Sequence, residues 1–162
     1  MTKIFLVDDE PLVLIGMQGM LNWAELGYTV VGTARNGAEA LKAIGETYPD
    51  IVVSDIRMPV MDGFEVLRTM NTNHTIEDVP VIMISSDDSE EAIRKAYELG
   101  ASDYVNRPFD AKIVYRRVSN TIKLYAKQRR LVQMVSDQIR AREKNTDVLV
   151  GVLSQIVEFR NG

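Results

Sequence analysis

The chain has 162 residues, of which 46% are hydrophobic and 26% are charged, as in ordinary soluble globular proteins. It contains no cysteine, which excludes a disulfide framework and a metal site built from thiolates. Asp8-Asp9-Glu10 interrupts the first apolar run, so no signal peptide is expected, and no run approaches the ~20 apolar residues that span a bilayer. We therefore expect a cytoplasmic protein that does not associate with membranes.

The net charge of −4 conceals two parts of opposite sign. Residues 1–110 carry 8 Lys and Arg against 19 Asp and Glu, whereas residues 111–162 carry 11 against 4. An acidic body is thus followed by a basic tail, which indicates two units with different roles.

Short apolar runs recur through the acidic body. The predicted strands cover residues 3–7, 28–32, 51–54, 81–84 and 102–105. Apolar runs of this length without polar alternation are typical of strands buried on both faces of a parallel sheet.

Helical patterns separate these strands. The predicted helices cover residues 11–26, 37–48, 63–70 and 89–99. Pro11 suits the first turn of a helix, Gly27 suits a helix end, and Ser89 is a plausible N-cap. The apolar face of the first helix is expected to comprise Leu12, Ile15, Met17, Met20 and Leu21. Strands that alternate with helices predict an α/β fold, with a parallel sheet between two layers of helices.

The chain changes character after Asp110, because residues 111–150 contain neither proline nor glycine. This length far exceeds the ~11–12 residues of a mean helix. A seam with heptad spacing runs through Val114, Val118, Thr121, Tyr125, Gln128, Val132, Val135, Ile139, Arg142, Thr146, Leu149, Leu153 and Ile156. Nine of these thirteen residues are apolar, which predicts a coiled coil and a homodimer through an extended C-terminal helix. Asn145-Thr146-Asp147 is alternatively a break with a new N-cap.

Carboxylates follow two of the predicted strands. Asp8 and Asp9 end the first apolar run and Asp55 ends the third. Ligands of parallel sheets bind at the carboxyl ends of the strands, and carboxylate oxygens suit Mg²⁺. A carboxylate can also accept a phosphoryl group as a nucleophile. Ser85 and Arg107, which end the fourth and fifth strands, would add a hydroxyl and a cation.

Four motifs at these spacings carry a resemblance to a known family. They are Asp8-Asp9-Glu10-Pro11, residues 54–63 around Asp55, residues 81–86 ending in Ser85-Ser86, and residues 103–109 with Pro108-Phe109. Over residues 1–122 the chain resembles the receiver domain of bacterial two-component response regulators. The resemblance implies a flavodoxin-like, doubly wound five-stranded sheet. It also implies a signalling module, not an enzyme, that takes a phosphoryl group from a sensor histidine kinase or phosphotransfer protein onto Asp55.

The resemblance assigns further roles by position. Asp9, Asp55 and the backbone carbonyl of Arg57 would ligate Mg²⁺, with Asp8 acting mostly through water. Ser85 takes the place of the hydroxyl residue that moves to the phosphoryl group. Tyr104 takes the place of the aromatic residue whose rotamer reports that movement.

Arg107 departs from the family pattern, which has Lys before the Pro-Phe pair. Arg is a wide planar fork, whereas Lys is a compact charge on a flexible stem. Arg107 is still able to pair with a phosphoryl group, even through two hydrogen bonds. A phosphate-independent receiver that serves as a dimerisation or interaction module is therefore an alternative.

The tail is expected to be a helical linker over residues 123–162. Residues 126–162 resemble the segment that leads into HD-GYP-type phosphohydrolase domains, but the metal-binding His and Asp residues of those domains are absent. We therefore expect the output domain to lie outside this chain. The basic residues between Arg116 and Arg130 are typical of a solvated helix face and accompany no recognition motif, so direct nucleic-acid binding is not expected.

Overall fold

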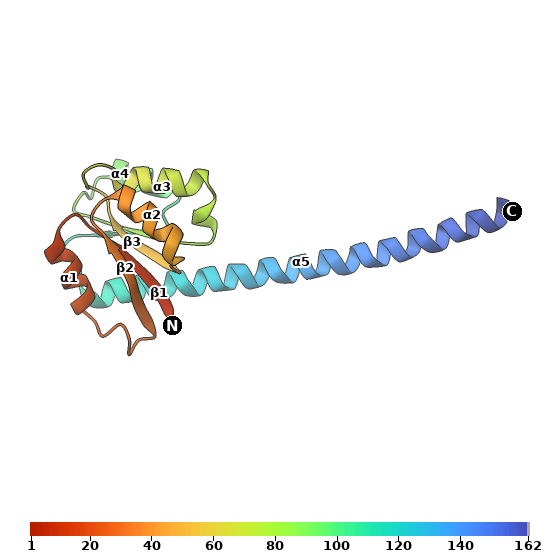
Figure 1. Cartoon of the computed structure of the whole chain (residues 1–162), viewed down its shortest axis with the longest axis horizontal. Coiled ribbons are helices and arrows are strands. Elements are labelled where there is room, and N and C mark those ends of the chain that lie inside the picture. The colour runs from red at the N-terminus through yellow and green to blue at the C-terminus, as the bar shows by residue number, and fades with distance from the viewer. Residues whose placement is uncertain (162) are drawn as a thin grey trace. The chain divides into compact units, whose positions relative to one another are not determined.

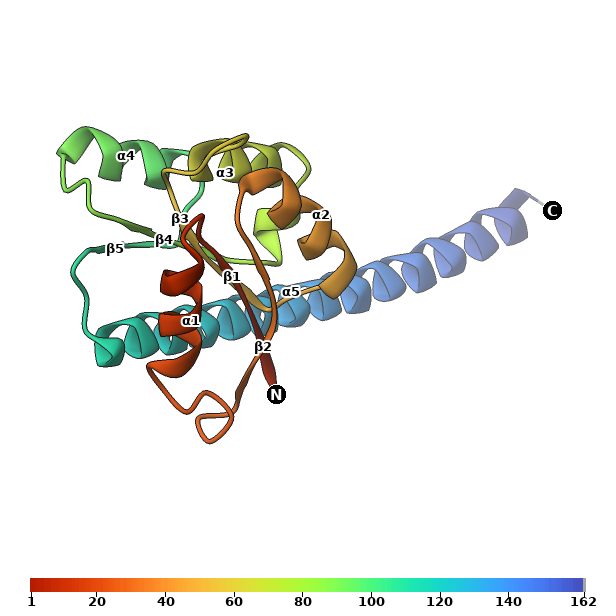
Figure 2. The same ribbon diagram turned by 60° about the vertical axis from the view of Figure 1, so that its left-hand side comes forward.

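Within residues 1–161, which the computed structural model describes, five parallel strands form one sheet of order β2-β1-β3-β4-β5 (Figures 1 and 2). The strands are β1 (Thr2–Val7), β2 (Tyr28–Ala34), β3 (Ile51–Asp55), β4 (Val81–Ser85) and β5 (Asp103–Asn106). The side chains of residues 147–150, 152 and 154–162 lie outside the description. The order places β1 and β3 side by side, as predicted for a doubly wound flavodoxin-like sheet.

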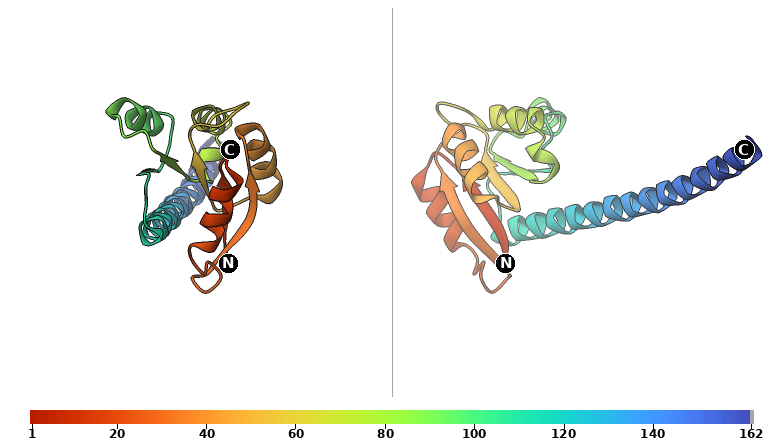
Figure 3. Two further views of the ribbon diagram at one scale, coloured as in Figure 1. Left: turned by 90° about the vertical axis from the view of Figure 1, so that its left-hand side faces the viewer. Right: turned by 45° about the vertical axis from the view of Figure 1, so that its right-hand side comes forward.

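Helices cover both faces of the sheet, and each face has its own apolar core (Figures 2 and 3). The helices are α1 (Pro11–Gly19), α2 (Gly37–Thr47), α3 (Gly63–Thr72), α4 (Glu90–Glu98) and α5 (Ala111–Asn161), with a short 3₁₀ turn η1 (Thr75–Glu77). Side chains alternate along each strand, so Phe5 and Val7 face α2, α3 and α4. Ile4 and Leu6 face α1 and the first turns of α5. This division confirms the predicted layers.

The first helix is shorter than predicted, and two of the five residues assigned to its buried face are exposed, whereas Met17 is buried and Met20 and Leu21 pack against the core. The helix ends at Gly19 rather than near Leu26, and it buries Leu14 and Met17. Leu12 and Ile15 are 81% and 66% exposed, because positions one and two residues away from Leu14 point to other sides of the helix.

Residues 20–27 form turns because Trp23 folds back onto the end of α1. Its indole Nε1 donates to Met17 O at 3.0 Å, which occupies one of the last helical carbonyls. The ring is buried and meets Tyr28 edge-on at a centroid distance of 6.0 Å, and Tyr28 meets Tyr115 of α5 in the same way at 6.1 Å. The apolar residues after Gly19 thus pack as a loop.

Side-chain caps fix the starts of three helices close to the predicted positions. Asn36 accepts from Glu39 N, Asp62 from Glu65 N, and Ser89 from Ala92 N. The Ser89 cap confirms its predicted role. The cap on Asp62 also sets where the loop after β3 ends.

The last helix, α5, runs from Ala111 to Asn161 without the alternative break at residues 145–147. The chain divides into two compact units, Met1–Lys123 and Leu124–Gly162. In the first unit Val114, Val118 and Thr121 are buried. The seam positions Leu149 and Ile156 lie outside the described side chains. Among the described residues, no helix is long and apolar enough to cross a membrane.

Candidate functional site

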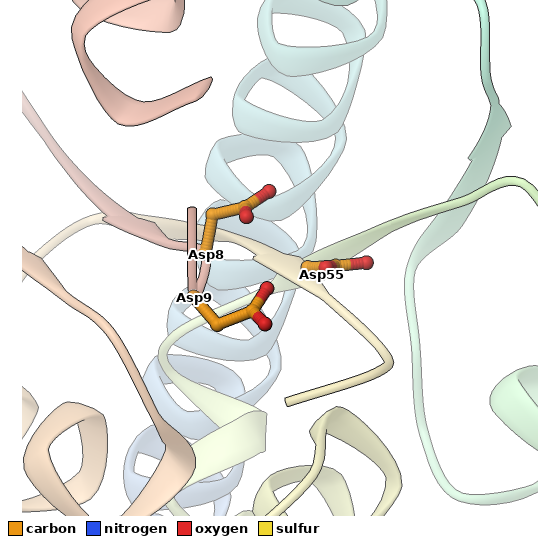
Figure 4. A group of neighbouring side chains, drawn as sticks. All are labelled: Asp8, Asp9 and Asp55. Atoms are coloured by element: carbon orange, nitrogen blue, oxygen red, sulfur yellow. The ribbon is translucent and has the colours of Figure 1, made fainter. Parts of the chain in front are cut away.

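Three carboxylates meet at the carboxyl ends of β1 and β3 (Figure 4). Asp8 and Asp9 directly follow β1, and Asp55 is the last residue of β3, which pairs with β1. One carboxylate oxygen from each of the three lies within 4.8 Å of the others. Parallel pairing of adjacent strands therefore brings together acids that are 46 or more positions apart in the sequence.

Asp8 is a buried acid with a complete set of partners. Its side chain is 1% exposed. Oδ1 accepts the Glu10 N–H at 3.0 Å, and Oδ2 accepts from Arg107 Nη2 at 2.5 Å. A buried carboxylate is tolerated when it is paired and hydrogen-bonded, so Arg107 supplies the positive charge that Asp8 requires.

Arg107 follows β5 and reaches two of the acids. Its backbone N–H donates to Ser85 O at 2.9 Å, which ties the end of β5 to the end of β4. Its Nη2 is 3.9 Å from Asp55 Oδ1. Its Nε is buried and has no hydrogen-bond partner among the described residues, so one donor of the guanidinium group is unused in this state.

The protein environment favours the neutral form of Asp55 more than water favours the neutral form of an ordinary aspartate. Burial, followed by the charge of Asp8, raises the pKa of Asp55 to about 6. Arg107 and a 2.8 Å hydrogen bond from Ile56 N lower it, and Asp9 raises it again. A cation placed among these acids would oppose the repulsion that raises the pKa.

The loop after Asp55 is packed closely against it. Gly63 N donates to Ile56 O at 2.8 Å, and a Cβ atom on Gly63 would lie 2.5 Å from Asp55 O. Only glycine fits this approach without moving the backbone. The Asp-Gly pair at positions 62 and 63 thus caps α3 and lets the loop close against the end of β3.

A pocket of about 250 Å³ opens over the acids. It is lined by Asp9, Glu10, Asp55, Arg57, Ser85, Ser86 and Arg107. Asp8, which pairs with Arg107, does not line the pocket. The carboxylate oxygens are hard ligands that suit Mg²⁺, and the open volume leaves room for the waters that this ion retains. The side chain of Arg57 turns to Asp87, with Nη2 3.8 Å from Oδ2.

The hydroxyl residues expected at the switch meet at Asp87, which sequence reasoning missed. Ser85 Oγ accepts the Asp87 N–H at 3.1 Å, and the Tyr104 hydroxyl donates to Asp87 O at 2.6 Å. Tyr104 is 7% exposed, and burial raises the pKa of its hydroxyl. The signal available for Asp87 was its position two residues after the strand-end Ser85, where its backbone N–H and C=O bond to Ser85 and Tyr104.

The structure therefore brings Asp9, Asp55, Ser85 and Arg107 around one pocket, with Asp8 buried and paired with Arg107. Tyr104 does not line the pocket, but its hydroxyl bonds to Asp87 O and to the side chain of Ser85, which does line it. The cluster lies at the carboxyl ends of the strands, which is where ligands of flavodoxin-like sheets bind.

Several curated proteins with similar sequences are regulators of transcription. The chain is 36% identical over 108 residues to the uncharacterized transcriptional regulatory protein YesN of Bacillus subtilis, over 67% of this chain and 29% of YesN. It is 35% identical over 125 residues to the DNA-binding transcriptional regulator NtrC of Escherichia coli, over 77% of this chain and 26% of NtrC. The chain thus spans less than a third of the length of either relative.

Solved structures resemble the chain over most of their own length. The signal receiver domain of the response regulator NarL from Mycobacterium tuberculosis superposes with a TM-score of 0.69 at 28% identity, over 75% of this chain and 96% of that one. CheY in the CheX-CheY-BeF3-Mg²⁺ complex from Borrelia burgdorferi gives a TM-score of 0.67 at 28% identity, over 74% and 87%. The family model of the response regulator receiver domain matches residues 4–119. The chain therefore belongs to the response regulator receiver domain family.

Proposed function

We propose that this receiver accepts a phosphoryl group on Asp55 in the presence of Mg²⁺, from a sensor histidine kinase or a phosphotransfer protein. The observation that carries the proposal is the cluster at one open pocket. Asp9, Asp55, Ser85 and Arg107 line this pocket, and a carboxylate oxygen of Asp8 lies within 4.8 Å of oxygens of Asp9 and Asp55. Asp55 lines the pocket, and both negatively charged side chains and the positively charged Arg107 act on it.

In this proposal a carboxylate oxygen of Asp55 attacks the phosphorus of a phosphohistidine. The new O–P bond forms as the N–P bond breaks, and the electron pair of that bond returns to the imidazole. Nη2 of Arg107 stands 3.9 Å from Asp55 Oδ1, within reach of the oxygens of the incoming group, and a turn of the side chain would bring its buried, unused Nε–H to one of them as well. A hydroxyl both accepts and donates, so Ser85 can keep its bond from Asp87 N while it donates to a phosphoryl oxygen.

Asp9, Asp55 and the backbone carbonyl of Arg57 would hold the metal, with Asp8 bound through water. When bound, Mg²⁺ would neutralise oxygens of the transferring group. The related CheY from Borrelia burgdorferi forms its complex with BeF3 and Mg²⁺, which supports this part of the proposal.

The proposed relay runs from Ser85 through Asp87 to Tyr104, because both hydroxyls bond to Asp87. A move of Ser85 toward a phosphoryl group would shift the Asp87 backbone and with it the acceptor of the Tyr104 hydroxyl. As part of the proposal, α5 pairs with a second copy of the chain and carries the change to an output domain outside it.

A second candidate is a phosphate-independent interaction module. The observation that favours it is the ion pair between Arg107 and Asp8, which already neutralises the most buried acid of the cluster. In this candidate the guanidinium group of Arg107 stays paired with Asp8, and the residues around the pocket do not change conformation.

Incubation with a small phosphodonor and Mg²⁺, followed by intact-mass measurement, separates the two candidates. We expect one added phosphoryl group on the chain and none on Asp55→Asn, whereas Asp50→Asn, at an acid whose side chain accepts from Lys3 N instead, keeps the modification. Labelling of Asp55→Asn would refute the assignment. An unmodified chain whose Arg107→Lys variant is modified would favour the second candidate.

A further inference from the structure

Beyond residue 123, α5 exposes apolar side chains along one face. Leu131, Val132, Val135 and Ile139 are 58%, 65%, 54% and 51% exposed. None of the side chains of residues 124–146 is buried. An apolar helix face of this extent is normally covered by another element.

These residues follow a repeat of seven. Tyr125, Val132 and Ile139 are seven residues apart, and Val135 stands three residues after Val132. A strict seven-residue repeat is the pattern of supercoiled helices, whereas a helix on a sheet needs only the period of ~3.6. β-Branched residues at the first position of the repeat, as at Val132 and Ile139, favour two parallel strands.

We propose that residues 124–146 of α5 form a parallel, in-register coiled coil with the same residues of a second copy of this chain. The layers that face the partner comprise Tyr125, Gln128, Val132, Val135, Ile139, Arg142 and Thr146. Leu131 flanks the Val132 layer and extends its apolar contact.

The charges of the segment suit an identical partner. Lys127 and Arg130 fall on the side of the helix away from the layers, so these charges of two copies stay apart, whereas Arg129 flanks the Gln128 layer. Arg142 is the one charged layer residue between 124 and 146. In a parallel pair it lies beside the partner's Glu143, which offsets the repulsion between the two Arg142 side chains.

An antiparallel pair that used the whole of α5 would run onto a face that is already buried in the first unit. An antiparallel pair centred on Val132 and Val135 would set the helix after Thr146 against Val114, Val118 and Thr121 of the other copy. Those three side chains are already 1%, 0% and 7% exposed, so the face that they form is not open to another helix. The parallel orientation over residues 124–146 rests on the β-branched residues Val132 and Ile139 at the first position of the repeat.

The absence of cysteine from the chain allows a direct test of the orientation. Ile139→Cys places a thiol in a layer, and Ala141→Cys places one on the opposite side of the same turn. Under mild oxidation we expect disulfide-linked dimers from most of the Ile139→Cys chain and few from Ala141→Cys. Cross-linking of Ile139→Cys only to a Gln128→Cys chain would mean an antiparallel pair and would overturn the proposal.

Two further variants test the interface without a cross-link. We expect Arg142→Leu to lower the dimer dissociation constant, and Ile139→Asp to raise it by roughly tenfold or more, in sedimentation equilibrium. Circular dichroism checks that each variant is folded. The proposal would be contradicted if the parent chain and both variants were monomeric at concentrations of several hundred micromolar.

The inference rests on the dimer in the proposed function and not on phosphoryl transfer. Asp55→Asn chains should cross-link through Ile139→Cys as well as chains with Asp55. A failure of phosphoacceptance and a failure of pairing are therefore separate results.

Discussion

The guanidinium group of Arg107 lies 2.5 Å from Oδ2 of Asp8, an acid with 1% of its side chain exposed. The two residues are 99 positions apart, and the pair links the end of β5 to the end of β1 across the sheet. The guanidinium group of Arg107 and a bound Mg²⁺ would both neutralise charge in the same cluster of acids, so their effects on stability should be linked.

Replacing Arg107 by Gln should destabilise the chain when no divalent ion is present. The change leaves Asp8 buried without its counter-charge, which typically costs about 3–5 kcal/mol of unfolding free energy. We expect Mg²⁺ to restore a larger part of the stability of this variant than it adds to the parent chain. Urea unfolding in chelator and in Mg²⁺ measures both effects. Arg94→Gln, at an exposed pair with Glu98, is the control, and equal responses to Mg²⁺ in both chains would contradict the linkage.

The raised pKa of Asp55 predicts a pH dependence of stability. Between the ordinary pKa of 3.8 and about 6, the folded state binds more protons at Asp55 than the unfolded state does. The contribution of Asp55 is therefore favourable at low pH and is lost as the pH rises through about 6. Without Mg²⁺, Asp55→Asn should be more stable than the parent chain at pH 7 by roughly 1–3 kcal/mol, and by less at pH 5. Urea unfolding at both pH values checks this, and a constant difference would contradict it.

Gly63→Ala should damage the site through the backbone. Its Cβ would lie 2.5 Å from Asp55 O, so the loop or the end of β3 must shift. We expect a loss of about 2 kcal/mol or more and a lower rate of modification of Asp55. Gly45→Ala in α2 is the matched control, because no atom lies within 4 Å of the added Cβ. Alanine there should stabilise the helix by about 0.5–1 kcal/mol.

The Tyr104 hydroxyl should contribute measurably to stability through Asp87. Tyr104→Phe removes the 2.6 Å bond to Asp87 O, which should cost about 0.5–1.5 kcal/mol. Tyr97→Phe removes a 3.3 Å bond to Asp103 at a more exposed position and should cost less. Thermal unfolding of the two variants compares them. An equal or larger loss for Tyr97→Phe would show that the Asp87 contact is not the stronger one.

The sequence was sufficient to predict which acids meet. Asp8, Asp9 and Asp55 each end an apolar run, and parallel pairing of such runs leaves their ends at one edge. The five strands and the layers of helices follow from the same runs. The caps at Asn36, Asp62 and Ser89 are local hydrogen bonds between residues three apart, so residue type alone indicates them.

Features that depend on tertiary contacts were harder to predict. The end of α1 depends on Trp23, whose ring packs against Tyr28 and whose Nε1 takes the Met17 carbonyl. Whether Arg107 pairs with Asp8 or with Asp55 depends on the rotamer of its side chain, which the surrounding tertiary structure selects. Asp87 acts through its backbone N–H and C=O, and residue type does not indicate such a role.

Trp23 is the one tryptophan of the chain, and its buried ring begins a series of edge-on contacts that continues through Tyr28 to Tyr115 of α5. Its emission therefore reports on the packing of α5 against the sheet without any added label. A shift of Tyr115 would change the packing around the indole through the one ring that lies between them, that of Tyr28. Titrations with Mg²⁺ or a phosphodonor can thus be followed by the intrinsic fluorescence of the unmodified chain.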